Sequence, residues 1–340
     1  MKTEFGLRSD GRMAYQYTIR SEALTAVLSD HGATLLKLFV PDSQGNLADV
    51  VLGFDNPGAY TESGTFFGAT VGRNSNRVGG AAFPMNGKTY RLDPNDNGVN
   101  NLHGGFDPYK NRLWDVASHS EKSITFTLQS PNGDQGFPGN AQISVTYTLF
   151  GRDLRIRYEA VSDMDTVFNM TNHTYFNLDG AGDIKNHKLK LNSHYYMTVR
   201  DDGLATGRVL PVEGTEFDFL EEKVIGPAIE KAAAAQPTVA GIDHHFFCDA
   251  ARSEYRHFGT LTASDDSLKM DIYTNQCGVQ IYTGNFVPQM TAYGRQAFPY
   301  CALTMETQAA PNSMNNSHLP SILLHRGERY YHKTGFRFYY

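Results

Sequence analysis

The sequence predicts an all-β protein whose strands are mainly antiparallel. Three observations support this fold class. Apolar and polar residues alternate with a period of two in many short segments, as they do in half-buried strands. Turn residues, including 32 glycines, separate these segments at short intervals. Only residues 221–235 read as a helix, so helices cannot supply the main layers of the fold.

The clearest strands form a hairpin near the middle of the chain. Residues 141–150 (AQISVTYTLF) and 153–161 (DLRIRYEAV) both alternate, and the short GRD connection between them predicts a tight turn. Residues 123–129 and 329–340 follow the same pattern and add two further strands. The predicted inward faces of the hairpin are Ile143, Val145, Tyr147 and Leu149 on one strand and Leu154, Ile156, Tyr158 and Ala160 on the other.

One helical segment and the absence of linkers complete the organisation of the chain. In residues 221–235 we expect Gly226 and Pro227 to break the helix into a short first part and a second turn or two. No Gly/Ser/Pro linker, low-complexity tract or repeat marks a boundary. We therefore expect one domain over residues 1–340.

Charge and composition exclude several classes of partner. The formal net charge is −6 and the pI is near 6.0, so no diffuse basic field attracts nucleic acid or anionic lipid. The sequence has no apolar leader and no apolar run long enough to span a membrane, which predicts a cytoplasmic protein with a neutral ligand. Cys248, Cys277 and Cys301 are odd in number and widely separated, so we expect reduced, partly buried thiols.

Two polar residues stand out on strand-like segments. The stretch NMTNHTYFNLDG (169–180) alternates, and one face would carry Thr171, His173, Tyr175 and Asn177. From this pattern alone, His173 is either hydrogen-bonded in a wet groove or an acid or base near neutral pH. Glu306 lies in the largely uncharged segment 301–316, where a carboxylate must be paired, hydrogen-bonded or functional.

Long Gly/Asn/Pro-rich loops at 56–80, 93–109 and 130–140 are expected to border a functional site. Further polar candidates sit among glycine or apolar neighbours, where ordinary loop hydrogen bonding, ion pairing or capping would also explain them: Asn76, Arg77, His103, Asp243 and Gln280. Neither H-E-x-x-H nor a cupin-like histidine pattern occurs, and nucleotide-binding motifs are missing. We therefore expect no metal and no cofactor.

Taken in order, seven stretches of the sequence resemble the aldose 1-epimerase family, the galactose mutarotases. No single stretch is specific, but the ordered set extends across residues 30–340. The stretches are GRNSNRVGGAAFPMNGKTYRL, NNLHGGFDPYKNRLWDV, GFPGN, TNHTYFNL, GIDHHFF, GVQIYTGN and METQAAPNSMNN.

The resemblance implies a single large antiparallel β-sandwich with few short helices and a sugar cleft on one concave sheet. It also implies that Glu306 is the general base and His173 the general acid. The sugar hydroxyls would be held by Asn76, Arg77, His103, Asp243 and Gln280, with Tyr175 or Phe286 against the sugar face. Two departures affect sugar preference: Asn312 stands where the family usually has Asp, and the 199–207 loop lacks the family's proline.

The implied reaction interconverts α and β anomers of free aldohexoses such as D-galactose and D-glucose. It needs one base on the C1 hydroxyl and one acid on the ring oxygen, so Glu306 should start ionised and His173 protonated. A glycoside hydrolase using Glu306 and Asp243 would leave His173 unexplained. A non-catalytic carbohydrate-binding protein is the main alternative, whereas an epimerase for phosphorylated sugars would need more basic residues than Arg73 and Arg77. The protein is expected to be a monomer or homodimer.

Overall fold

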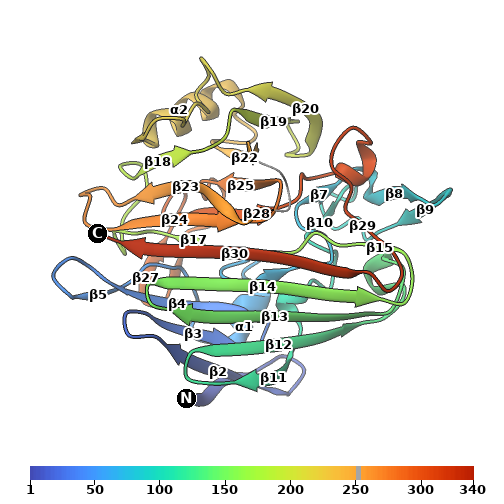
Figure 1. Ribbon diagram of the computed structural model, residues 1–340, viewed down its shortest axis with the longest axis horizontal. Helices are drawn as coiled ribbons and strands as arrows, with labels where there is room; N and C mark the ends of the chain where they lie inside the picture. Colours follow the sequence, from blue (N-terminus) through green and yellow to red (C-terminus); the bar gives the residue numbers. More distant parts are fainter. Residues whose placement is uncertain (250–253) are drawn as a thin grey trace.

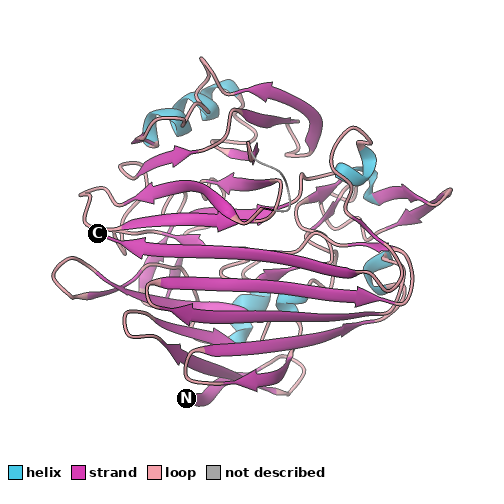
Figure 2. Cartoon of the chain, in the orientation of Figure 1, coloured by secondary structure: helices cyan, strands magenta, loops and turns pink. Residues whose placement is uncertain are grey.

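The computed structural model describes residues 1–249 and 254–340, and strands make up most of its ordered structure (Figure 2). This confirms the predicted all-β class. The strands form three larger sheets and several two-stranded pairs, and every pairing between the named strands is antiparallel. Two short α-helices lie outside these sheets in the described residues (Figure 1).

A nine-stranded sheet forms one broad layer, and strand β30 lies in its interior between β14 and β24 (Figure 1). The predicted hairpin is confirmed, because β13 pairs with β14 along its whole length and ends at Phe150 opposite Asp153. In spatial order the strands are β11 (Asp115–His119), β12 (Ser123–Ser130), β13 (Ala141–Phe150), β14 (Asp153–Ser162), β30 (Arg329–Tyr339), β24 (Lys269–Thr274), β23 (Arg256–Thr262), β18 (Lys188–Leu191) and β21 (Lys223–Val224).

A six-stranded sheet packs behind the first and carries polar residues on one face. Its register places Gln280 directly opposite both His245 and Glu306, so these side chains share a face. The strands in order are β17 (Tyr175–Phe176), β28 (Leu303–Gln308), β25 (Gly278–Tyr282), β22 (Asp243–Phe247), β19 (Tyr195–Val199) and β20 (Ala205–Pro211).

The remaining strands are short or lie near the N-terminus. A five-stranded sheet contains β1 (Lys2–Leu7), β2 (Met13–Arg20), β3 (Thr25–Ser29), β4 (Thr34–Pro41) and β5 (Leu47–Asp49). The two-stranded pairs are β6 (Thr70–Val71) with β16 (Thr171–Asn172), β7 (Arg77–Val78) with β10 (Asn101–Leu102), β8 (Ala82–Met85) with β9 (Lys88–Arg91), β15 (Thr166–Val167) with β29 (Leu323–Leu324), and β26 (Met290–Ala292) with β27 (Arg295–Ala297).

The main hydrophobic core contains residues from the nine-stranded sheet and from the five-stranded and six-stranded sheets. Ile143 and Ile156 contribute from the hairpin, while Phe176, Ile281 and Met305 contribute from the inner face of the six-stranded sheet, and all five are buried. The opposite face of the six-stranded sheet is therefore left for polar side chains, because successive residues of a strand point to opposite faces.

Both α-helices differ from the sequence prediction. Helix α1 (Pro57–Glu62) lies inside the loop expected at 56–80, and the side chain of Asn56 caps it. Helix α2 (Gly226–Ala235) begins at the Gly-Pro pair that was expected to interrupt a helix. Proline fits the first turn of a helix because its missing N–H has no partner there. The preceding part forms the short strand β21 instead.

The segment 169–180 is not one continuous strand. Its two strand pieces, β16 and β17, pair with different partners, β6 and β28, and His173 and Thr174 lie between them. Residues on both faces of this segment are buried. Cys248, Cys277 and Cys301 are thiols rather than disulfides, as predicted. No helix in the described ranges has the length and apolarity to cross a membrane.

Candidate active site

A cavity of about 510 Å³ lies over the polar face of the six-stranded sheet. Loops around residues 63–66, 76–77, 97–103 and 201–203 form its other walls. Seven of the eight residues predicted from the sequence line it: Asn76, Arg77, His103, His173, Tyr175, Asp243 and Glu306. The eighth, Gln280, is buried beneath the cavity and contacts its wall through Asp243.

His173 is held rigidly at the point where the chain passes from β16 to β17. Its backbone N–H donates to the carbonyl of Ala69 at 2.9 Å, and its carbonyl accepts from the N–H of Gly68 at 3.0 Å. The imidazole stacks on Tyr175, with ring centroids 5.1 Å apart and an interplanar angle of 27°. The ring of Phe66 packs against the imidazole from another side, with ring centroids 5.6 Å apart. Backbone and ring contacts together fix the direction of the imidazole.

Glu306 approaches His173 from the neighbouring strand β28. The Oε1 atom of Glu306 lies 3.4 Å from Nε2 of His173. The hydroxyl of Thr304 donates to the same Oε1 at 3.0 Å, which orients the carboxyl group. Only 5% of His173 and 2% of Glu306 is exposed, so little water screens the pair.

Burial changes the protonation of this pair. It raises the pKa of Glu306 to about 8, despite the opposing hydrogen bond from Thr304. It lowers the pKa of His173 to about 3. The expected resting state, an ionised Glu306 beside a protonated His173, is therefore opposite to the direction of both shifts. The pair still holds one proton at neutral pH, because a neutral carboxyl and a neutral imidazole carry the same total.

His103 lies next to His173 and is held in one tautomer. The backbone N–H of Asn76 donates to Nδ1 of His103 at 3.2 Å, so Nδ1 is an acceptor and Nε2 carries the proton. Burial holds the pKa of His103 well below its usual range, and a positive charge on His173 or Arg77 lowers it further. His103 is therefore a neutral hydrogen-bond donor.

Charged groups form the opposite wall of the cavity. Arg77 donates through Nε to Asp96 at 3.0 Å. Gln280 donates through Nε2 to Oδ1 of Asp243 at 2.7 Å, which explains its position behind the cavity. Burial raises the pKa of Asp243, although Arg77 and Gln280 act in the opposite direction. Arg73, the other arginine considered, is buried elsewhere and donates to Ser130.

The two departures from the family pattern meet in the structure. The side chain of Asn312 accepts from the N–H of Gly79 at 3.1 Å and donates to the carbonyl of Ala205 at 3.2 Å. It thereby ties the 199–207 loop to the segment after Arg77. Gly203 in this loop has a φ of 76°, and a Cβ there would lie 2.9 Å from the guanidinium carbon of Arg77. The loop therefore packs directly on Arg77.

Sequence reasoning missed several residues of the cavity wall. Phe66 contacts both histidines, with its ring 4.7 Å from that of His103. The only sequence feature that pointed to Phe66 was its position in the Gly-rich loop 56–80, which was expected to border the site. Tyr282 also lines the cavity, and its hydroxyl accepts from the N–H of Phe286 at 2.8 Å. Phe286, considered as a sugar platform, is 60% exposed at the rim.

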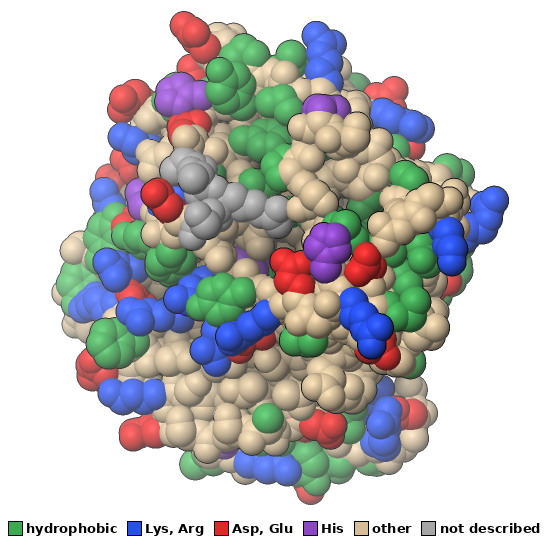
Figure 3. Space-filling view, turned by 45° about the vertical axis from the view of Figure 1, so that its right-hand side comes forward, with side chains coloured by type: hydrophobic (Ala, Val, Ile, Leu, Met, Phe, Trp, Pro, Cys, Tyr) green, Lys and Arg blue, Asp and Glu red, His purple; other side chains and the backbone are tan. Residues whose placement is uncertain are grey.

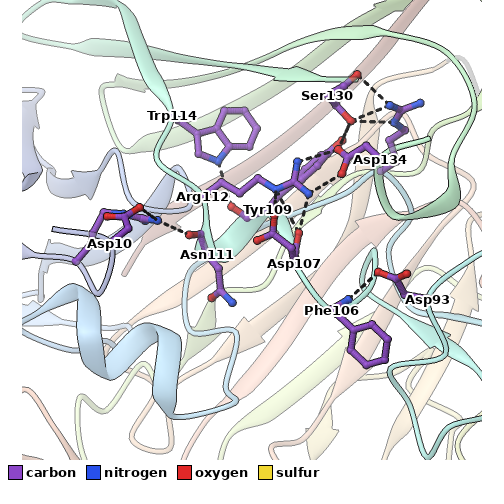
Figure 4. A network of polar contacts seen from close by, with 12 residues as sticks. Asp10, Asp93, Phe106, Asp107, Tyr109, Asn111, Arg112, Trp114, Ser130 and Asp134 are labelled. Carbon is purple, nitrogen blue, oxygen red and sulfur yellow. Dashed lines mark hydrogen bonds and ion pairs between the residues drawn. The ribbon is translucent and has the colours of Figure 1, made fainter. Parts of the chain in front are cut away.

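Arg112 supports the loop that carries His103 (Figure 4). Its guanidinium donates two hydrogen bonds to Asp134, at 2.8 and 2.7 Å, and also contacts the carbonyl of Asp107. The indole of Trp114 donates to the carbonyl of Tyr109 at 3.2 Å. The Arg112–Asp134 hydrogen bonds link the segment after loop 93–109 to loop 130–140. Loops 56–80 and 93–109 line the cavity as expected, whereas no residue of 130–140 does.

Within residues 1–249 and 254–340, no group of three His, Cys, Asp or Glu side chains is arranged to hold a metal ion. The paired His173 and Glu306 face each other directly, and an acid and base in contact need no metal to exchange a proton.

Comparison with known proteins identifies the family. The model of the aldose 1-epimerase family matches residues 15–337. The chain is 36% identical to a galactose mutarotase from Rattus norvegicus, covering 99% of this chain and 98% of that one. It is 34% identical to an aldose 1-epimerase from Escherichia coli strain K12, covering 98% of this chain and 97% of that one.

Solved structures agree with this result. An aldose epimerase homologue from C. elegans superposes with a TM-score of 0.88 at 29% identity, covering 96% of this chain and 99% of that chain. A galactose 1-epimerase from Lactobacillus acidophilus superposes with a TM-score of 0.86 at 27% identity, covering 100% of this chain and 98% of that chain. The predicted β-sandwich of the mutarotase kind is thus confirmed, and the chain belongs to the aldose 1-epimerase family.

Proposed function

We propose that this protein interconverts the α and β anomers of free aldohexoses such as D-galactose and D-glucose, with His173 and Glu306 as the acid and base. The observation that carries this assignment is the 3.4 Å approach of His173 to Glu306 at the base of a buried cavity. Anomer exchange moves one proton off the C1 hydroxyl and one proton onto the ring oxygen, so it needs one acid and one base side by side.

Sugar binding prepares the pair for this exchange. In the absence of a bound sugar, burial favours the neutral forms of Glu306 and His173. Transfer of the shared proton gives an ionised Glu306 and a protonated His173 with no change in proton count. A C1 hydroxyl that donates to Glu306, together with a ring oxygen that accepts from His173, stabilises this charged form by hydrogen bonding.

The reaction then proceeds through the open-chain aldehyde. Glu306 takes the C1 hydroxyl proton while His173 donates to the ring oxygen, and the bond between C1 and the ring oxygen breaks. Rotation about the C1–C2 bond presents the other face of the carbonyl. Closure of the ring reverses both proton transfers and returns the pair to its starting state, so no electrons or groups leave the substrate.

The other cavity residues bind a neutral polyol. His103 supplies a neutral N–H donor, Asp243 supplies acceptor oxygens, and Arg77 supplies the free nitrogens of its guanidinium. Asn76 adds an amide, and the ring of Tyr175 backs His173 and forms part of the apolar wall. Gln280 acts by holding Asp243. We also propose that residues 1–340 act as one domain, because one core contains residues from Tyr17 to Phe338.

Polarimetry tests this proposal. Freshly dissolved α-D-galactose is followed by optical rotation with the wild-type protein, Glu306→Gln and His173→Asn. We expect each variant to lose about 10²- to 10⁴-fold in kcat, the usual contribution of a positioned acid or base, with a much smaller change in KM. His325→Asn, an exposed histidine, is the matched control. Sugar binding without any acceleration by the wild-type protein would support the non-catalytic alternative.

A further inference from the structure

A second cavity, of about 810 Å³, lies on the outer face of the nine-stranded sheet. It shares no lining residue with the candidate active site. Its floor comes from the outward residues of β14 and β30: Arg155 and Arg157 point out, whereas their neighbours Leu154 and Tyr158 are buried in the core. We call this cavity the outer-face pocket.

A glycine and two tyrosines shape the outer-face pocket. Gly335 pairs with Arg155 on one side and Tyr273 on the other. The hydroxyl of Tyr255 occupies the space that a Cβ at Gly335 would need, so the glycine lets Tyr255 lie close to the sheet. The Tyr255 and Tyr273 rings stack with centroids 5.9 Å apart at 25°, and 46% of Tyr255 is exposed. An aromatic surface therefore borders the pocket.

The pocket is strongly positive although the protein is acidic. Five Lys or Arg side chains line it against one Asp, whereas the whole chain carries a net charge of −6. Figure 3 shows many Lys and Arg side chains gathered on the left half of the face in view. The lining cations are Arg155, Arg157, Arg256, Lys333 and Arg337, and the lining acid is Asp153.

The cations outnumber the carboxylates that could neutralise them. Asp153 is shared, since both Arg155 and Arg337 contact it at 2.7 Å. Glu159 at the edge is likewise shared between Arg157 and Arg329. Asp271, opposite Arg337 in the β24–β30 ladder, offsets part of the charge of the first pair. The excess positive charge therefore lies mainly at Arg157 and Arg329.

Two more cations have no carboxylate partner in the described part of the chain. The ammonium of Lys333 lies 5.9 Å from the Tyr255 ring and 5.4 Å from the Tyr331 ring. Arg256 donates to the backbone carbonyls of Glu254 and Gln276, and its buried Nε has no hydrogen-bond partner there. A buried donor of this kind is costly unless something accepts from it.

We propose that the outer-face pocket binds a small phosphate-bearing metabolite, with the phosphate between Lys333 and Arg157 and the organic part against Tyr255. Arg157 and Lys333 are directly opposite each other in the β14–β30 ladder, so both cations reach the same point. Guanidinium forks match phosphate oxygens, and a phosphate ester carries nearly two negative charges at pH 7. The cavity volume lies in the range of small-molecule sites.

The side of the pocket formed by β12 and β13 suits a polar organic part. Side-chain hydroxyls line it, and they pair across the strands at 2.9 Å for Ser123 with Thr148 and 3.0 Å for Thr125 with Thr146. Such hydroxyls donate and accept with a sugar or ribose equally well. The ring of Tyr255 would stack on a planar base. A hexose phosphate and a nucleotide are therefore the two sources to distinguish.

Calorimetry on the full chain tests the proposal. The probes are inorganic phosphate, a hexose 6-phosphate and a nucleoside monophosphate, each titrated at low salt with D-galactose in excess to occupy the candidate active site. We expect saturable binding of at least one phosphate ester, weakened about tenfold by Lys333→Gln and by Arg157→Gln. Lys88→Gln, which removes an exposed cation from the β8–β9 hairpin, is the matched control.

The outcomes separate this proposal from the catalytic one. Both substituted side chains point to solvent, so mutarotation by Lys333→Gln and Arg157→Gln should equal that of the wild type, which also verifies folding. Tighter binding of the nucleotide, reversed by Tyr255→Leu, would identify a nucleotide ligand, and tighter binding of the hexose phosphate would identify a sugar phosphate. No binding of any probe, equal binding by all variants, or binding only of long polyanions such as duplex DNA would overturn the proposal.

Discussion

Replacing Glu306 by glutamine should change how the stability of the protein depends on pH. Burial raises the pKa of Glu306 from its ordinary 4.5 to about 8. The folded protein therefore keeps this proton up to about pH 8, whereas the unfolded chain releases it above about 4.5. Stability contributed by Glu306 is present at low pH and is lost as the pH rises through that window.

The size of the effect follows from the two pKa values. Proton linkage predicts that the wild type loses about 3 kcal/mol relative to Glu306→Gln between pH 5 and pH 8. Glutamine has nearly the same shape but no proton to release, so the difference between the two proteins isolates this one group. Other ionisable groups cancel because both proteins contain them.

Urea denaturation at pH 5, 6, 7 and 8 measures this difference. Trp114 is the single tryptophan of the chain and is 2% exposed, so its fluorescence reports the loss of the core. Glu121→Gln, at an exposed glutamate, is the control and should track the wild type at every pH. A constant difference between Glu306→Gln and the wild type would mean that Glu306 is already ionised against a protonated His173, and would refute the neutral resting pair.

Three further predictions concern the candidate site and its supports. The rate of mutarotation should be highest while the His173–Glu306 pair holds one proton and should fall above about pH 8, since Glu306 has a pKa of about 8. Polarimetry from pH 5 to 9.5 checks this prediction. A rate that keeps rising past pH 9, after subtraction of the uncatalysed rate, contradicts it. Asn312→Asp should destabilise the protein by about 1–3 kcal/mol in urea, because a carboxylate cannot donate to the Ala205 carbonyl. Asn132→Asp, at an exposed residue whose side chain accepts from the N–H of Gly139, is the control, and equal losses would argue against the bond to Ala205. Arg112→Lys should lower the free energy of unfolding by about 2 kcal/mol, because lysine cannot replace the two hydrogen bonds to Asp134. Arg20→Lys is the control. An unchanged melting temperature of Arg112→Lys would show that these bonds contribute little.

The sequence predicts local strand patterns well because alternation is a property of neighbouring residues. The β13–β14 hairpin has both its strands and its turn within 22 residues of chain, 141–162, so its pairing could be anticipated. The pairing of β17 with β28 joins residues more than 100 positions apart, for example Tyr175 with Thr304, and no local pattern specifies it. His173 lies outside a strand because β16 and β17 belong to different sheets, which again depends on distant partners.

The residue types of the candidate site could be predicted, but which side chains line the cavity and which lie behind its wall could not. Seven of the eight predicted residues line the cavity because motif resemblance selects chemistry. Gln280 was expected to touch the sugar, yet its amide is directed to Asp243 behind the wall. Phe66 was missed because an apolar residue in a loop carries no signal of which rings it will contact. Burial shifts the pKa values of Glu306 and His173 against the expected charged pair, and burial cannot be read from a strand pattern alone.

The interior position of β30 has a consequence for biosynthesis. Among the described residues, strands β11–β14 are joined to strands β24, β23, β18 and β21 in one sheet through residues 329–339. Until the ribosome delivers these residues, β14 and β24 each retain an open edge that can pair with another nascent chain. Productive folding of the sheet therefore waits for β30, and premature termination upstream of residue 329 should yield chains that aggregate or engage chaperones.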